Sequence, residues 1–367
     1  MRLGVRDMLR AKLKFGLLGG ALALLVFLLL FLNTLSSTLL GFFTGAVRHN
    51  SADVLVYNGA ARKNLQASRL DPSLIVTVRK VPGVAAAGEV GNTTLTVDVG
   101  RGPTDLNLWG FEPGQPGGPG RVVGRIVPGA GEALVDEADR NNGFKVGGLI
   151  RIEPSGETLR VVGYTRDSRF NVGPTAYTTL GTYRSILRAA NPQAMDTDNL
   201  FGVRVTHGVS PATAVRAIDA SSPSLEALTR AQAVTSLPGV SSITQSFDLV
   251  VGITFVIVVV VIGFFFLILT VQKLRTFAML RAVGATTGYL ASSLAVQVVI
   301  MVLVGAAAAT VLLGTAAVNS SAAFPLKVDP KLLGVATGAV LLFSLAASFL
   351  SVRRIARLDP AEAAGLR

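Results

Sequence analysis

The chain has 367 residues, of which half are hydrophobic and only 15% are charged, and its formal net charge is +12. A soluble globular chain is rarely so poor in charge, so the composition argues against an ordinary soluble protein. The excess of Lys and Arg does not indicate nucleic-acid binding, because it lies beside the long apolar blocks, whereas basic and acidic residues nearly balance in the segment between the first two blocks.

Four apolar blocks each exceed the roughly 18 residues that mark a transmembrane candidate. None has Asp, Glu, Lys or Arg in its interior, as expected when a charge at the bilayer centre costs several kcal/mol. The blocks are Phe15–Phe43, Leu249–Val271, Leu290–Val318 and Leu332–Val352. The first is too long for the apolar core of a cleavable signal peptide, so we expect a retained helix that continues beyond the membrane as a stalk.

Basic residues flank these blocks at the start of the chain, between the second and third blocks, and after the fourth. The positive-inside rule then places both termini and the middle connection in the cytoplasm of a bacterial cell (inner) membrane. We therefore predict an integral membrane protein with four helices, split one plus three, and a large extracytoplasmic α+β domain between helices 1 and 2. The expected segments are 1–14 cytoplasmic, 15–45 helix 1 and stalk, 46–247 outer domain, 248–272 helix 2, 273–289 cytoplasmic connection, 290–318 helix 3, 319–331 outer loop, 332–352 helix 4 and 353–367 cytoplasmic tail.

The outer segment carries 20 basic and 17 acidic residues and, like the whole chain, no cysteine, so no disulfide is expected there. Period-two patterns predict strands at 52–57, 93–99, 133–135, 159–164 and 201–206, with another strand from 149. Helices are expected at 74–81 and 210–220, where Ser210 is the cap and Pro211 the first residue. We expect the early and late parts to pack together, a β-rich middle between them, and a flexible loop at 113–120.

The outer segment shows no signature of an enzyme. Neither G-x-S-x-G, H-E-x-x-H nor a Walker motif occurs in the sequence. The acidic group Asp136, Glu137 and Asp139 is expected to be a solvated helix face, because no His or Cys is near it to complete a metal site. We expect no catalytic residue, no metal and no cofactor on this chain.

Small and polar residues within the apolar blocks indicate how the helices could pack. Gly16 and Gly20 in the first block, and Gly334 and Gly338 in the fourth, have the four-residue spacing that lets helices approach closely. Asn33 and Gln297 are more typical of hydrogen bonds between helices than of a polar pathway.

The connection around Leu280–Leu290, LRAVGATTGYL, is too polar for the bilayer core and too apolar for an idle loop. Lys273 to Arg281 can extend the second helix, Gly284 breaks it, and the following Thr residues can cap the next helix. The exposed turn would either insert into a groove on a cytoplasmic partner or rest on lipid headgroups, and the residues alone leave both readings open.

Three motifs resemble the FtsX/MacB-type permease family of ABC transporters, and especially its DevC-like branch. QKLRTFAMLRAVGA, residues 272–285, is similar to the family's R-E-x-A-x-L-[KR]-A-[IVM]-G segment, with Thr276 in place of Glu. LVDE at 134–137, VGGLIRI at 146–152 and VVGY at 161–164 resemble the extracytoplasmic core, with Gly148 where Asp is common. RLDPAEA, residues 357–363, is similar to the family's closing L-x-P-x-E-A-L.

The resemblance implies a permease half whose two copies form a homodimer, with an ABC-type ATPase subunit bound at each coupling helix. ATP and Mg would then sit on that partner and not on this chain. The implied ATPase-coupling residues are Arg275, Leu280, Arg281, Ala282, Val283, Gly284 and Ala285. Family members act by mechanotransmission, in which ATP-driven movement reaches the outer domain through the stalks.

Three functions stay open. The first is export or extraction of a lipid, peptide or drug-like molecule, with a membrane-fusion adaptor as a further partner. The second is FtsX-like signalling that activates a cell-wall hydrolase without transport. The third is an anchored adhesion or scaffold protein that needs no ATPase.

Overall fold

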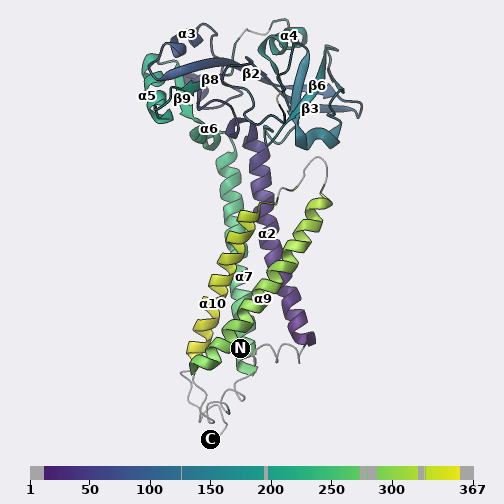
Figure 1. Cartoon of the computed structure of the whole chain (residues 1–367), viewed down its shortest axis with the longest axis vertical. Helices are drawn as coiled ribbons and strands as arrows, with labels where there is room; N and C mark the ends of the chain where they lie inside the picture. The colour runs from purple at the N-terminus through teal and green to yellow at the C-terminus, as the bar shows by residue number, and fades with distance from the viewer. Residues whose placement is uncertain are drawn as a thin grey trace. The chain divides into compact units, whose positions relative to one another are not determined.

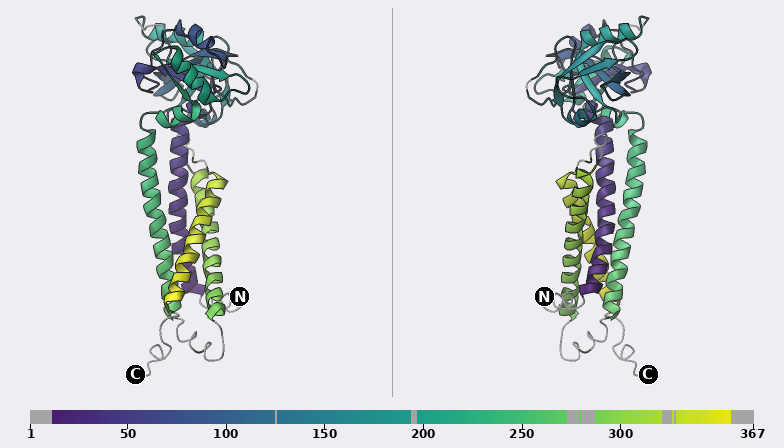
Figure 2. Two further views of the ribbon diagram at one scale, coloured as in Figure 1. Left: turned by 90° about the vertical axis from the view of Figure 1, so that its left-hand side faces the viewer. Right: turned by 90° about the vertical axis from the view of Figure 1, so that its right-hand side faces the viewer.

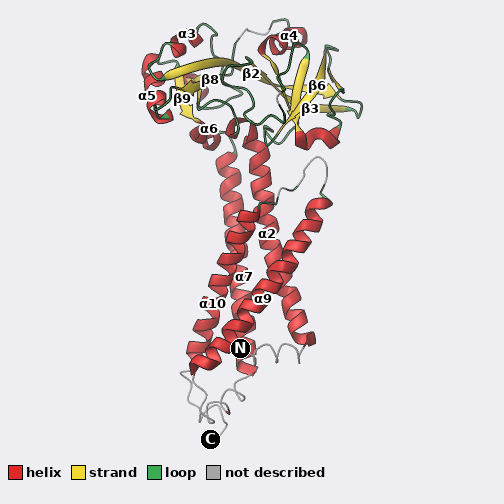
Figure 3. Cartoon of the chain, in the orientation of Figure 1, coloured by secondary structure: helices red, strands yellow, loops and turns green. Residues whose placement is uncertain are grey.

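The computed structural model describes residues 12–124, 126–193, 197–272, 279, 287–320, 326 and 328–355. It divides into two compact units. The described residues of the helical unit fall within 12–37, 245–320 and 326–355, and those of the sheet unit are within 38–244. All the strands belong to the sheet unit (Figure 3).

The helical unit contains parts of two long helices, α2 (Lys12–Arg48) and α7 (Val240–Gln272), together with α9 (Thr287–Val318) and α10 (Pro330–Ile355). These helices run side by side in the views of Figures 1 and 2. Their core joins Leu22 and Leu29 of α2, Ile262 of α7, Val302 of α9 and Val340 of α10. Many apolar side chains on the other faces of these helices are exposed. Helices that are apolar all round are expected in lipid and not in water.

Three of the described helices are long and apolar enough to cross a membrane, over Phe15–Arg48, Val240–Phe265 and Ala295–Val318. In the region of the fourth apolar block, the apolar helix Pro330–Ala346 within α10 is shorter than the other three. Three of the predicted spans are therefore supported, whereas the count of four and the direction of the termini stay predictions. At about 1.5 Å per residue, the 37 residues of α2 extend about 55 Å, well beyond the roughly 30 Å hydrocarbon core of a bilayer.

The sheet unit is α+β, as predicted. Its strands are β1 (Val54–Asn58), β2 (Val84–Asp98), β3 (Pro103–Phe111), β4 (Glu132–Asp136), β5 (Leu149–Ile152), β6 (Thr158–Thr165), β7 (Thr175–Thr179), β8 (Leu200–Val205) and β9 (Leu225–Thr229). Its helices are α3 (Leu74–Arg79), α4 (Leu180–Ala190), α5 (Pro211–Ser221) and α6 (Arg230–Ser236), with 3₁₀ turns η1 (Gly59–Ala61) and η2 (Glu137–Asn142).

Strand pairing divides the sheet into two parts that share the long strand β2. Its first half pairs with β8 in an open four-stranded part of order β2-β8-β1-β9. Its second half pairs with both β3 and β5. The order β3-β7-β4-β6-β5-β2 therefore closes through the β2–β3 pairing into a six-strand ring. This arrangement confirms that early and late segments pack together around an inserted β-rich middle.

Helices cover both parts because the strands bury apolar side chains on two faces. In β1, Val54 and Val56 pack with α3 and α5, whereas Leu55 and Tyr57 face the core that contains the end of α2. Inside the six-strand ring, alternate residues such as Leu106 and Leu108 form a second core.

Helix α4 lies against the ring where two glycines face each other. Gly91 of β2 pairs with Gly110 of β3, and the side chain of Tyr183 lies so close that a Cβ added at either glycine would be under 2.4 Å from one of its atoms. Only glycine leaves room for this tyrosine, which is buried.

The expectation of a flexible loop at 113–120 is wrong in one respect. The segment is a turn-rich loop, but Pro116, Gly117 and Gly118 are buried. An added Cβ on Gly202 of β8 would lie 2.6 Å from the Cα atom of Gly117, and one on Gly88 of β2 would lie 2.5 Å from the carbonyl oxygen of Pro116. The loop therefore packs tightly on two strands at positions where only glycine fits.

Candidate functional site

The predicted coupling residues Arg275, Leu280, Arg281, Ala282, Val283, Gly284 and Ala285 lie outside the described residues. Among the described residues, the last turns of α2 form close contacts with another segment of the sheet unit, and we take this contact as the candidate site. We call the contact between residues 42–50 and residues 167–172 the helix-end junction. All of its residues belong to the sheet unit.

Main-chain hydrogen bonds join the two segments of the helix-end junction. The Ala46 N–H donates to the Arg169 carbonyl at 2.8 Å. In return, the Asn171 and Val172 N–H groups donate to the carbonyls of Phe43 and Phe42 at 3.1 and 3.3 Å. Backbone groups near a helix end are costly to leave unpaired when they are buried, and each such bond contributes about 0.5–1.5 kcal/mol.

Gly45 lets the two backbones approach this closely. A Cβ built on Gly45 would lie 2.5 Å from the Asp167 carbonyl oxygen and 2.9 Å from that of Arg169. These are backbone atoms, which cannot rotate away as a flexible side chain could. Gly41, one turn earlier on the same helix, has no such neighbour within 4 Å.

The segment that holds the helix end is conformationally strained. Asp167, Asn171 and Val172 have φ values of 53°, 50° and 65°. A positive φ is a genuine outlier for a β-branched residue such as Val172, and such strain persists only where the surrounding structure imposes it. Here the hydrogen bonds to the carbonyls of Phe43 and Phe42 hold Asn171 and Val172 in place.

A buried ion pair stabilises the junction from the other side. Arg169, 1% exposed, makes a salt bridge to Asp139, which is fully buried, and its Nε donates to Asp139 Oδ2 at 3.1 Å. Its guanidinium carbon also lies 4.4 Å from the centre of the Phe42 ring on α2. Burial raises the pKa of Asp139, and the facing Arg169 guanidinium opposes that shift.

The structure therefore corrects the expectation of a solvated acidic face at residues 136–139. Asp136 and Asp139 are 1% and 0% exposed, and only Glu137 points toward solvent, where it pairs with Arg166. Asp136 accepts a hydrogen bond from the Ser168 N–H at 2.7 Å. Sequence reasoning missed this site because Arg169 lies 30 residues after Asp139, with no local pattern that links them.

His49 adds a further hydrogen bond to the helix-end junction. Its Nδ1 lies 2.7 Å from the Asp167 carbonyl oxygen, which can only accept, so Nδ1 carries the proton and donates. Burial lowers the pKa of His49, while the hydrogen bond to Asp167 raises it in part. This bond and the ion pair add to the main-chain hydrogen bonds of the helix-end junction.

The glycines predicted to pack helices lie on exposed faces of the single chain. A Cβ built on Gly16, Gly20, Gly334 or Gly338 would meet no other atom within 4 Å. They therefore do not bring helices together within one chain, and their role at a contact with a second copy stays a prediction. Within the helical unit a tighter approach occurs at Gly305 of α9, where a Cβ would lie 3.3 Å from Leu22 Cγ.

Two family models match the chain. The model described as MacB-like periplasmic core domain matches residues 18–221, and the model described as FtsX-like permease C-terminal matches residues 249–360. The first match covers more than half of the chain.

The curated relatives are two strains' versions of one protein of Staphylococcus epidermidis, predicted to be the hemin transport system permease HrtB. Each is 26% identical over 118 residues, which is 32% of this chain and 34% of the relative. The chain thus spans about a third of the length of the curated relatives it matches.

Two solved structures are also similar. The periplasmic region of MacB from Actinobacillus actinomycetemcomitans is 12% identical with a TM-score of 0.37, over 55% of this chain and 95% of that one. The extracellular domain of the noncanonic ABC-type transporter YknZ from Gram-positive bacteria is 13% identical with a TM-score of 0.34, over 48% and 99%. TM-scores this low support no argument about the architecture or the function.

Proposed function

The chain belongs to the FtsX/MacB-type family of ABC transporter permeases, and from that premise we propose that it is a mechanotransmitting subunit. A separate ATPase subunit hydrolyses ATP in the cytoplasm. The resulting movement passes along α2 to the extracytoplasmic domain, where it exports or extracts the substrate.

The observation that supports this proposal most directly is the helix-end junction. Helix α2 is one element from Lys12 to Arg48, and its last turns are joined to residues 167–172 by hydrogen bonds and by the stacking of Arg169 on Phe42. A helix that ended in a free linker could move without moving the domain that follows it. A helix end fixed by paired backbone groups and a buried ion pair carries its displacement into the domain.

The ATPase partner is proposed to bind the segment that contains Arg275 and residues 280–285. ATP and Mg would then be bound by that partner, and not by this chain. We also propose that two copies of the chain form the membrane unit. The exposed glycine faces at Gly16, Gly20, Gly334 and Gly338 are where a second copy or another membrane helix could approach closely.

The proposed substrate class is a lipid, a peptide or a drug-like molecule. A membrane-fusion adaptor is the proposed further partner for its export. Hemin, which the name of the Staphylococcus relative mentions, is one amphipathic compound to include among the candidates. The FtsX-like alternative, in which the outer domain activates a cell-wall hydrolase, differs in its extracytoplasmic partner.

Purification from native membranes tests the proposal. The tagged chain, extracted in mild detergent and analysed by mass spectrometry, is expected to bring a stoichiometric ATP-binding-cassette subunit with it. An adaptor in the same complex would support export, and a hydrolase would support signalling. A chain that purifies alone, under conditions that preserve other such complexes, would contradict the proposal.

A charge-reversed variant makes this test specific to the coupling segment. Arg281→Glu is expected to abolish ATPase co-purification, because it reverses the charge on the segment that docks the partner. Arg216→Glu is the matched control, since Arg216 is exposed on α5 in the sheet unit. Equal ATPase recovery with the two variants would argue against the assigned coupling residues.

A further inference from the structure

An open pocket lies in the sheet unit between the six-strand ring and the open part of the sheet, with a volume of about 230 Å³. Phe111 at the end of β3, Leu134 of β4, and loop residues within 113–119, at 122 and within 126–128 contribute one side. Ser51, just before β1, and Arg204 of β8 contribute the other side. The residues that line this pocket are separate from those of the helix-end junction.

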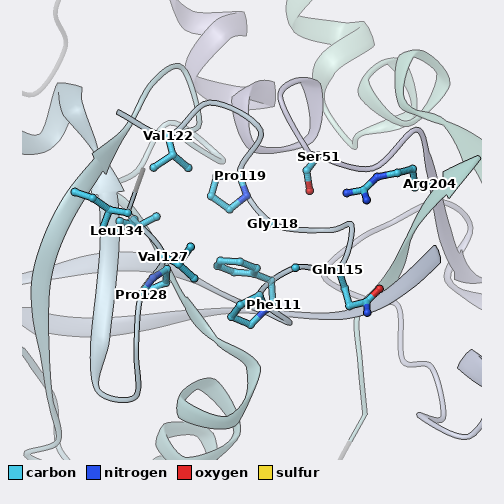
Figure 4. Close-up of a pocket in the computed structure, with 13 residues that line it drawn as sticks. Ser51, Phe111, Gln115, Gly118, Pro119, Val122, Val127, Pro128, Leu134 and Arg204 are labelled. Atoms are coloured by element: carbon cyan, nitrogen blue, oxygen red, sulfur yellow. The ribbon is translucent and has the colours of Figure 1, made fainter. Parts of the chain in front are cut away.

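The pocket is apolar at one end and polar at the other. Figure 4 shows Val122, Leu134 and Val127 gathered at one end, with the ring of Phe111 beside them. Val127 is 66% exposed, although it is apolar, so its side chain is available to a ligand. An exposed aliphatic group on a pocket wall is stabilised when a hydrocarbon covers it.

The opposite end of the pocket carries a cation. Arg204 is exposed, and no described residue forms a salt bridge with it. Figure 4 shows its guanidinium turned toward Ser51. Ser51 Oγ already accepts the Gly117 N–H at 3.1 Å, which fixes the side of the pocket that faces Arg204. A guanidinium matches the two oxygens of a carboxylate in a bidentate pair.

We infer that this pocket binds a small anionic amphiphile, with a carboxylate at Arg204 and an aliphatic chain against Val122, Val127 and Leu134. The volume is below the roughly 300–1,000 Å³ of sites that enclose a drug-sized ligand. The pocket therefore takes a head group and part of one chain, while the rest of the ligand remains outside. The inference goes beyond the proposed function, because such binding needs neither nucleotide nor an ATPase.

Photolabelling tests the inference in the full chain. The protein is placed in nanodiscs of zwitterionic lipid, without nucleotide or ATPase, and exposed to a fatty acid that carries a mid-chain diazirine. A second probe has the same chain and a trimethylammonium head. Labelled peptides are mapped by mass spectrometry, and the fluorescence of Trp109, the single tryptophan, checks that each variant is folded.

The acid probe is expected to label residues 111–134, and the cationic probe to label them at least about tenfold less. Arg204→Glu should lower labelling by the acid at least about tenfold, whereas Arg216→Glu should leave it unchanged. Val127→Asp, a change at an exposed site, should also lower it. Equal labelling by the two probes, full labelling of Arg204→Glu, or labelling confined to the helical unit would overturn the inference.

Discussion

Replacing Gly45 with alanine tests whether the close backbone approach at the helix-end junction is needed. The new Cβ would lie 2.5 Å from the Asp167 carbonyl oxygen and 2.9 Å from that of Arg169, so the two segments must separate. Overpacking of this kind costs about 1–3 kcal/mol. Replacing a helical glycine with alanine returns about 0.5–1 kcal/mol. We therefore expect a net loss of about 1–2 kcal/mol in the free energy of unfolding of the sheet unit.

Gly41→Ala is the matched control on the same helix. An added Cβ there meets nothing within 4 Å, so only the favourable helix term applies, with a gain of up to about 1 kcal/mol. Urea unfolding of the full chain in detergent can be followed by Trp109, which is buried in the sheet unit. With a slope of about 2 kcal/mol per molar urea, the two midpoints should differ by about 1 M. Equal midpoints would refute the reasoning about this contact.

Three further predictions concern the sheet unit and use the same urea assay. Arg169→Met should lower the free energy of unfolding by about 3–5 kcal/mol, because it leaves the Asp139 carboxylate buried without its partner. Adding Asp139→Leu should recover a large part of this loss, and no recovery would contradict the ion-pair account. Gly202→Ala should lower the free energy of unfolding by about 1–3 kcal/mol, because the new Cβ clashes with the loop at residues 113–120. Gly181→Ala is the control, since it has open space around it and should not destabilise the protein. Similar losses for the two variants would count against the packing of this loop. The pKa of His49 in the folded protein is below the ordinary value of 6.5, so its contribution to the free energy of unfolding is present above about pH 6.5 and is lost as the pH falls through the folded pKa. His49→Gln should therefore reduce the loss of stability between pH 7.5 and 5.5. An unchanged pH profile of stability would exclude this role.

Sequence patterns predicted those parts of the fold that depend on neighbouring residues. Ser210 accepts a hydrogen bond from the Thr213 N–H and caps α5, with Pro211 at its first position, as the local pattern indicates. The long apolar runs likewise predicted the helices α2, α7 and α9, because hydrophobic length alone marks them. Within α10 the apolar helix Pro330–Ala346 is shorter, so the fourth span stays a prediction.

Contacts between distant residues could not be read from the sequence. Nothing near Asp139 in the sequence indicates that Arg169 neutralises it, so the local pattern favours a solvated acidic cluster. Similarly, Gly91 and Gly110 were not singled out, since their need for glycine arises from Tyr183, which is far along the chain. The predicted coupling segment was identified by family resemblance and not by geometry, and it stays a prediction.

We propose that ATP-driven movement reaches the outer domain through the helix-end junction, and a distance measurement tests this directly. The chain has no cysteine, so Arg216→Cys supplies one unique attachment site for a spin label in the sheet unit. In a reconstituted complex with its ATPase, two copies would give one label-to-label distance, measured by pulsed electron paramagnetic resonance.

We predict that this distance changes between the nucleotide-free and ATP-trapped states, and that Gly45→Ala suppresses the change while ATP hydrolysis continues. The Gly41→Ala protein should behave like the parent chain. A distance that is the same in both nucleotide states of the parent chain, or a full change in Gly45→Ala, would contradict the account.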